Sequence, residues 1–251
     1  MKRLLTLALA FVLMITITVS ASAVTFVESI TNKGAPELVV IDQIEGKDVV
    51  GFVTTPDGEF ITSEFEDCFD IYSMEDVIKD KTPDDVEDEM NKAYDELSKP
   101  DANLSDICPG LDEVVKEKWG PDKSADDLVV RDFFYIDEKC GEFQDAFKNG
   151  NTIDLTFRVN IPAGTFFTAM VYVDGKWQPV VDAFNNGDGT VTVKFDKLCP
   201  VAFLVPRTQL NADKVSPTTG DMTSVAIWGS VLVVSLLAIT GLVIYRRKRY
   251  N

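Results

Sequence analysis

The chain has 251 residues, with 41 acidic residues, 24 basic residues and no histidine. The lack of histidine excludes a Ser-His-Asp triad, a Cys-His pair and a histidine-ligated zinc site. The net charge of −17 argues against nucleic acid and against anionic membrane surfaces as partners. No Gly-x-Ser-x-Gly, P-loop or dinucleotide fingerprint is found either, so we expect no catalytic residues, no metal and no cofactor.

The first 23 residues have the pattern of a secretory signal peptide. Lys2-Arg3 precedes an apolar stretch from Leu4 to about Val19, and the small residues Ala21-Ser22-Ala23 follow. This order predicts export and cleavage after Ala23. The exported part would then contain all 41 acidic residues but only 18 basic ones, a net charge of −23.

Residues 24–126 are expected to begin with a β-meander and continue as an acidic helical segment. Runs rich in β-branched residues at Glu37–Ile41 and Val49–Val53 flank a turn at Glu45–Asp48. A second turn at Pro56–Gly58 leads into Phe60–Thr62. Alternating short strands and turns of this kind predict antiparallel pairing.

Helix signals start at Ser73. Ser73 and Asp76 have the spacing of a capping box, and a second helix is expected with Thr82 as its N-cap and Pro83 at its first position. This second helix should run to about Leu97. A further helical segment is expected over Leu104–Trp119, with its apolar residues on one face.

The acidic run at the start of the second helix could be mistaken for a metal site. It consists of Asp84, Asp85, Glu87, Asp88 and Glu89. An EF-hand loop needs alternating acids, a central glycine and a late glutamate, and this run has a different spacing. We therefore interpret it as a solvated helical face.

Residues 127–206 return to a β pattern. The expected strands are Leu128–Val130 leading into Phe133–Ile136, Ile153–Val159, Phe166–Val173, Lys176–Val181, Thr190–Phe195 and Cys199–Val205. Short strands separated by Gly/Asp turns, such as Asn185–Gly189, suggest a β-sandwich. Trp177 is expected to anchor the core, with a ligand platform as the alternative.

Four cysteines lie in the exported part: Cys68, Cys108, Cys140 and Cys199. Their long spacings contain no Cys-x-x-Cys, which argues against a zinc site. Two disulfides with three alternative pairings, or free buried thiols, are both compatible with the sequence.

The C-terminus contains an apolar run followed by basic residues. Residues 223–245 form 23 residues without a charge, and Arg246-Arg247-Lys248-Arg249 follows. At about 1.5 Å per residue such a helix spans a hydrocarbon core of roughly 30 Å, and the basic tail 246–251 would stay cytoplasmic. We therefore predict one transmembrane helix, preceded by a linker at residues 207–222.

That linker contains Ser216-Pro217-Thr218-Thr219-Gly220. With the apolar span and basic tail behind it, the motif resembles the cell-wall sorting signal of Gram-positive surface proteins, whose usual form begins Leu-Pro. Ser216 stands at the leucine position, as in clostridial variants. The resemblance implies that a sortase attacks the Thr219 carbonyl, releases Gly220 onward, and transfers the acyl group to a peptidoglycan precursor.

A second resemblance covers roughly Leu128–Val205. The sequence DGKWQPVV followed by NGDGTVTVKFDKLCPVAFLV is similar to a domain found in sorting-signal surface proteins of gut clostridia. Cys199 stands at the usual serine, and no catalytic activity is implied. The Gly187-Asp188-Gly189 loop could bind calcium, but a hairpin turn explains it without an ion.

The expected fold is α+β: a β-meander, an acidic helical segment, a C-terminal β-sandwich-like (Ig-like) half and one C-terminal transmembrane helix. The expected function is that of a non-enzymatic surface protein, anchored to the cell wall and binding an extracellular ligand. Alternatives are a single-pass membrane protein with an intact anchor, a carboxylate-dependent hydrolase of surface glycans, and a pilin subunit.

Overall fold

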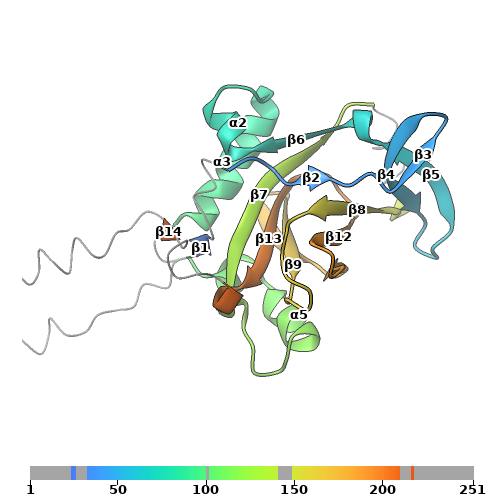
Figure 1. Ribbon diagram of the computed structural model, residues 1–251. Helices are drawn as coiled ribbons and strands as arrows, with labels where there is room; N and C mark the ends of the chain where they lie inside the picture. The colour runs from blue at the N-terminus through green and yellow to red at the C-terminus, as the bar shows by residue number, and fades with distance from the viewer. Residues whose placement is uncertain (1–23, 27–32, 100–101, 141–148, 210–215, 218–251) are drawn as a thin grey trace, which may run out of the picture.

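The computed structural model describes residues 24–26, 33–99, 102–140, 149–209 and 216–217 (Figure 1). The expected signal peptide with Ala23, the apolar span 223–245 and the basic tail 246–251 lie outside the described residues. Within the described ranges no helix is both long enough and apolar enough to cross a membrane.

Two β-sheets form the body of the protein. Sheet A has the order β10 (Lys176–Val180), β9 (Thr168–Val173), β13 (Pro200–Pro206), β7 (Leu128–Glu138), β1 (Thr25–Phe26) and β14 (Ser216–Pro217), and β6 (Phe69–Ser73) also pairs with β7. Sheet B has the order β11 (Ala183–Asn185), β12 (Thr190–Phe195), β8 (Thr152–Arg158), β4 (Lys47–Thr54) and β3 (Asp42–Ile44). In sheet B, β2 (Glu37–Leu38) also pairs with β8, and β5 (Phe60–Phe65) with β4.

The inner faces of the two sheets share one apolar core. Phe134 and Phe203 of sheet A pack edge to face, with ring centroids 4.8 Å apart, and Phe157 of sheet B lies 5.3 Å from Phe203. Every second residue of β8 and β12 points into this core, because side chains alternate between the faces of a strand. The strand pattern read from the sequence therefore places the core correctly.

Helices cover the other face of sheet A. They are α2 (Met74–Ile78), α3 (Asp84–Leu97), α4 (Leu104–Ile107) and α5 (Leu111–Lys118), with short 3-10 turns at η2 (Glu66–Cys68), η3 (Ala125–Asp127) and η5 (Arg207–Gln209). Met90 and Leu97 lie on the buried stripe of α3, in a second apolar cluster. Trp177 belongs to that cluster and is 1% exposed, so the prediction of a core tryptophan is confirmed.

The helix starts agree only in part with the prediction. Ser73 and Asp76 form the expected capping box at α2. The expected N-cap at Thr82 is wrong, because the residue before α3 is Pro83 and no side chain caps the helix. The expected continuous helix over Leu104–Trp119 is also broken, since Gly110 has a φ of 92° between α4 and α5.

The two expected halves of the body, residues 24–126 and 127–206, share both sheets. An antiparallel β3-β4-β5 meander is present, but its first strand is Asp42–Ile44 and not the expected Glu37–Ile41, because Glu37–Leu38 pairs with β8 instead. Strand β4 also pairs with β8 from the second half, with Gly51 opposite Leu155. Likewise β1 runs parallel to β7, with Phe26 opposite Val130. The sequence position 126/127 therefore does not separate two cores, and the fold is mixed α+β with mostly sheet.

Candidate functional site

The four cysteines divide into one bridge and two thiols. Cys68 and Cys140 form a disulfide with an S–S distance of 2.09 Å, whereas Cys108 and Cys199 are buried and free. Burial raises the pKa of the Cys108 thiol to about 12, and burial, reinforced by the charge of Glu89, raises that of Cys199 to about 12. Neither thiol is therefore a reactive nucleophile at neutral pH.

The first two residues of the sorting-like motif lie in β14. Ser216 is opposite Phe26 and Pro217 is opposite Thr25 in an antiparallel pair with β1. The guanidinium of Arg207 donates a hydrogen bond of 2.7 Å to the Thr25 hydroxyl on the same strand. Thr218, Thr219 and Gly220 lie outside the described residues.

The loop between β11 and β12 is a hairpin turn held by its own side chains. The Asp188 carboxylate accepts bonds from the Thr190 backbone N–H at 3.0 Å and from the Thr190 hydroxyl at 2.6 Å. Asn185 accepts a bond of 2.9 Å from the Gly187 N–H. The two bonds from Thr190, the hydroxyl bond first, lower the pKa of Asp188, because they stabilise its ionised form. The predicted turn is confirmed.

The acidic start of α3 lies largely in solvent, since Asp84, Asp85, Asp88 and Glu89 are exposed. No group of three or more Cys, Asp and Glu side chains in the described part of the chain is arranged to hold a metal ion.

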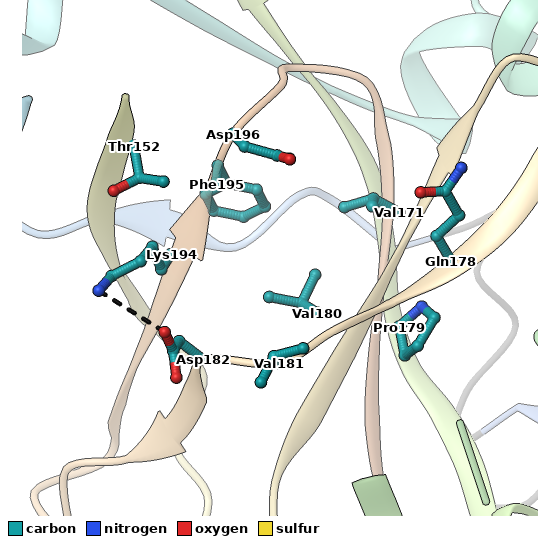
Figure 2. A pocket seen from close by; sticks show the side chains of 10 residues that line it. All are labelled: Thr152, Val171, Gln178, Pro179, Val180, Val181, Asp182, Lys194, Phe195 and Asp196. Carbon is teal, nitrogen blue, oxygen red and sulfur yellow. Dashed lines mark ion pairs between the residues drawn. The ribbon is translucent and has the colours of Figure 1, made fainter. Parts of the chain in front are cut away.

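A pocket of about 210 Å³ opens where the edges of the two sheets meet, between β10 and β12 (Figure 2). Its apolar wall is formed by Val171, Val180 and the almost fully buried Phe195. The other lining residues are Thr152, Gln178, Pro179, Val181, Asp182, Lys194 and Asp196. An apolar interior with a polar mouth is typical of sites for small ligands or for parts of larger ones.

The mouth of the pocket is shaped by the segment that passes from β10 to β11. Val181 and Asp182 form this crossing from sheet A to sheet B. The Lys118 ammonium of α5 donates to the Val181 carbonyl, and the Lys194 N–H donates to the Asp182 carbonyl at 2.9 Å. The crossing is therefore held by hydrogen bonds from α5 and from β12, which together fix the position of the pocket rim.

One cation lies between two carboxylates at this rim. Lys194 Nζ lies 3.6 Å from Asp182 Oδ2, as drawn in Figure 2, and Lys194 is directly opposite Asp154 on β8. Partial burial raises the pKa of Asp154, and the charge of Asp182 adds to this, while Lys194 acts in the opposite direction. Lys194 thus compensates two negative charges at once.

The lining residues offer groups that can bind a polar ligand. The pocket has carboxylates, an ammonium group, an amide and a hydroxyl. These groups can accept and donate hydrogen bonds to a polar ligand whose apolar part contacts Val180 and Phe195.

Sequence reasoning did not single out this pocket. Asp154 and Lys194 occupy the outward positions of alternating strands, which marks them as surface residues, but their pairing depends on the register of β8 with β12. The strand expected at Lys176–Val181 ends one residue earlier, and the change of sheet at Val181 and Asp182 left no distinct sequence signal. Comparisons of the chain with models of known families, with curated proteins and with solved structures find no match.

Proposed function

We propose that this chain is an exported bacterial surface protein, anchored to the cell wall through Thr219, that acts by binding an extracellular ligand. The observation that supports it most is the C-terminal order of residues: Ser216–Gly220, then 23 residues without a charge, then Arg246–Arg249. The uncharged run would span the membrane as a helix until processing, and the basic tail would keep it from passing through.

The anchoring step is an acyl transfer performed by a sortase. The sortase thiolate attacks the Thr219 carbonyl, the bond to Gly220 breaks, and the released amine takes up a proton. An amine of the peptidoglycan precursor then attacks the thioester, forms an amide with Thr219 and frees the thiolate. This chain is the substrate in both steps.

The position of β14 is consistent with display of the body away from the anchor. Ser216 and Pro217 pair with β1, which directly follows the expected signal-peptide cleavage site. In Figure 1 this pair lies at one side of the molecule, and the β3–β5 meander lies at the opposite side. The meander would then be far from the anchor.

Mass spectrometry of the C-terminal peptide, after muramidase digestion of cell walls, tests the proposal. We expect a peptide that ends at Thr219 and is linked to a wall peptide. A Thr219→Ala variant should remain in the membrane, whereas Thr218→Ala, at the variable position of the motif, should still be anchored. An intact peptide that runs through Gly220 to the tail in the wild type would instead favour a single-pass membrane protein.

A further inference from the structure

Among the residues that the structure describes, no helix covers the outer face of sheet B, unlike the outer face of sheet A. Helices α2 to α5 pack on sheet A around the second apolar cluster. On sheet B, the outer residues include three phenylalanines: Phe52 is half-buried, Phe60 is 62% exposed and Phe184 is 53% exposed. The register places all three on the same face, opposite to the shared core.

Threonine hydroxyls lie between these rings. Thr54 and Thr152 are cross-strand neighbours with hydroxyl oxygens 3.4 Å apart, and Thr156 and Thr192 are neighbours with oxygens 2.9 Å apart. The Asn186 amide donates to Thr192 at 3.0 Å. Phe52 and Phe60 pack on each other with ring centroids 5.8 Å apart, so the face has an aromatic pair at one end, hydroxyl and amide groups in the middle and Phe184 at the other end.

The charges of this face nearly balance, which is unusual in this protein. Asp154 and Asp182 are set against Lys194, and Arg158 Nε lies 3.6 Å from Glu37. By contrast, the segment from Met74 to Asp127, which covers sheet A, has 18 acidic and 7 basic residues. Within the described part of the chain, the β face without a helix on it is thus much less acidic than the helical side.

The pocket continues this face at its edge. Thr152 and Lys194 belong both to the outer side of sheet B and to the pocket lining, and Asp182 of the crossing segment lines the pocket beside Lys194. From Phe60 on β5 to Phe184 on β11 the face crosses four strand spacings of about 4.8 Å, roughly 19 Å in all. Such a surface fits an extended chain with one unit in the pocket better than a single small molecule.

We propose that the outer face of sheet B and the adjoining pocket bind an uncharged oligosaccharide chain. Sugar rings present an apolar C–H face, which packs on phenylalanine, and hydroxyls, which bond to threonine, amide, carboxylate and ammonium groups. Phe60 and Phe184 hold the two ends of the chain, and Thr152, Asp182 and Lys194 bind the unit that enters the pocket. The inference names the ligand class for the binding function proposed above.

The charge distribution argues for this occupant over others. An anionic glycan would be repelled by the net charge of −23 on the exported part. A cationic protein would be drawn to the acidic helices on the other side of the molecule rather than to a balanced face.

Isothermal titration calorimetry of the full chain tests the proposal. The protein is kept in a zwitterionic detergent, whose headgroup contains no sugar. The probes are hexasaccharides of the cello-, xylo-, manno- and malto- series, with polygalacturonate and polylysine as charged probes. We expect at least one neutral hexasaccharide to bind, and Phe60→Ala and Phe184→Ala each to weaken its binding by about tenfold.

Ile78→Ala is the matched control, because Ile78 on α2 is 61% exposed but lies outside this face. It should leave the affinity unchanged, and all three variants should keep the thermal midpoint of the wild type. Three results would overturn the proposal. The first is that no neutral hexasaccharide binds, and the second is that its affinity is the same in Phe60→Ala and Phe184→Ala as in the wild type. The third is that the wild type binds polylysine and that these two variants no longer do. If the bound hexasaccharide became shorter during the titration, this face would be a site of glycan hydrolysis and the binding proposal would be wrong. Wall anchoring is measured separately, so either proposal can fail alone.

Discussion

Cys68 and Cys140 are joined by a disulfide, with their Cα atoms 5.2 Å apart and a sequence separation of 72 residues. Cys68 lies between β5 of sheet B and β6 of sheet A, and Cys140 follows β7 of sheet A before the chain returns to sheet B at β8. The disulfide therefore connects two of the crossings between the sheets.

Removing this bridge should destabilise the fold strongly. For a closed loop of this length the double variant Cys68→Ala/Cys140→Ala should lose about 4 kcal/mol of unfolding free energy, because its unfolded chain is less restricted. Urea unfolding measures the loss. A reducing agent should bring the wild type to the stability of the variant and leave the variant unchanged. If the oxidised and the reduced wild type had the same unfolding free energy, the disulfide would not stabilise the fold.

The two remaining cysteines should be hidden until the protein unfolds. Cys108 and Cys199 are buried, and their raised pKa leaves almost no thiolate at neutral pH. Maleimide labelling followed by mass spectrometry should find no modified cysteine in the native protein and two in the denatured, unreduced protein. Two disulfides in the unreduced protein, or rapid labelling of the native state, would show that this assignment is wrong.

Gly51 should not tolerate a larger residue. A Cβ atom at this position would lie 2.7 Å from Ile153 Cδ1 and 2.9 Å from the Asp154 carbonyl oxygen. Because the backbone oxygen cannot move away easily, Gly51→Ala should cost about 1–3 kcal/mol of unfolding free energy. Gly34→Ala is the control, since a Cβ there meets no atom within 4 Å, and its effect should stay within about 0.5 kcal/mol. Equal effects of the two changes would argue against the β4–β8 register.

The sequence was sufficient for the elements with strong periodicity. The stripe of Val86, Met90 and Leu97 predicted α3 and its buried face, and alternation predicted β8. In both elements the apolar spacing matches the geometry of the backbone, so local pattern and tertiary packing agree.

The pairing of strands that are far apart in the sequence could not be predicted from local sequence patterns. The pairing of β4 with β8 joins segments about 100 residues apart, and nothing in either segment specifies the other. The same holds for Asp132, which is buried although charged. Asp132 lies opposite Phe203, next to a register shift between Phe203 and Leu204, and Lys33 Nζ lies 2.6 Å from Asp132 Oδ1. A bulge of this kind re-aims side chains without a sequence signature of its own.

The candidate pocket was missed for the same reason. Val180 and Phe195 look like ordinary strand residues, and they form one wall only because the edges of the two sheets meet there. The sequence drew attention instead to the two ends of the chain, where the patterns that we interpret as targeting signals are contiguous in sequence.

Asp112 should give the protein a pH-dependent part of its stability. Its carboxylate accepts hydrogen bonds from the Ala125 N–H at 2.7 Å and from the Ser124 hydroxyl at 3.1 Å, which joins α5 to η3. These bonds, the backbone one first, lower the pKa of Asp112. The stabilisation is therefore complete above the unfolded pKa of about 3.9 and disappears as the pH falls through the lower folded value.

Asp112→Asn should thus lower the unfolding free energy by about 1 kcal/mol at pH 7, because the neutral amide accepts these bonds less strongly. The difference from the wild type should shrink below about pH 4 and vanish in stronger acid. Urea unfolding at a series of pH values measures it. Glu113→Gln removes an exposed charge from the same turn and should change stability by less than about 0.5 kcal/mol. A difference between wild type and Asp112→Asn that stays constant from pH 7 to pH 3 would mean that the ionised carboxylate is not what holds η3 against α5.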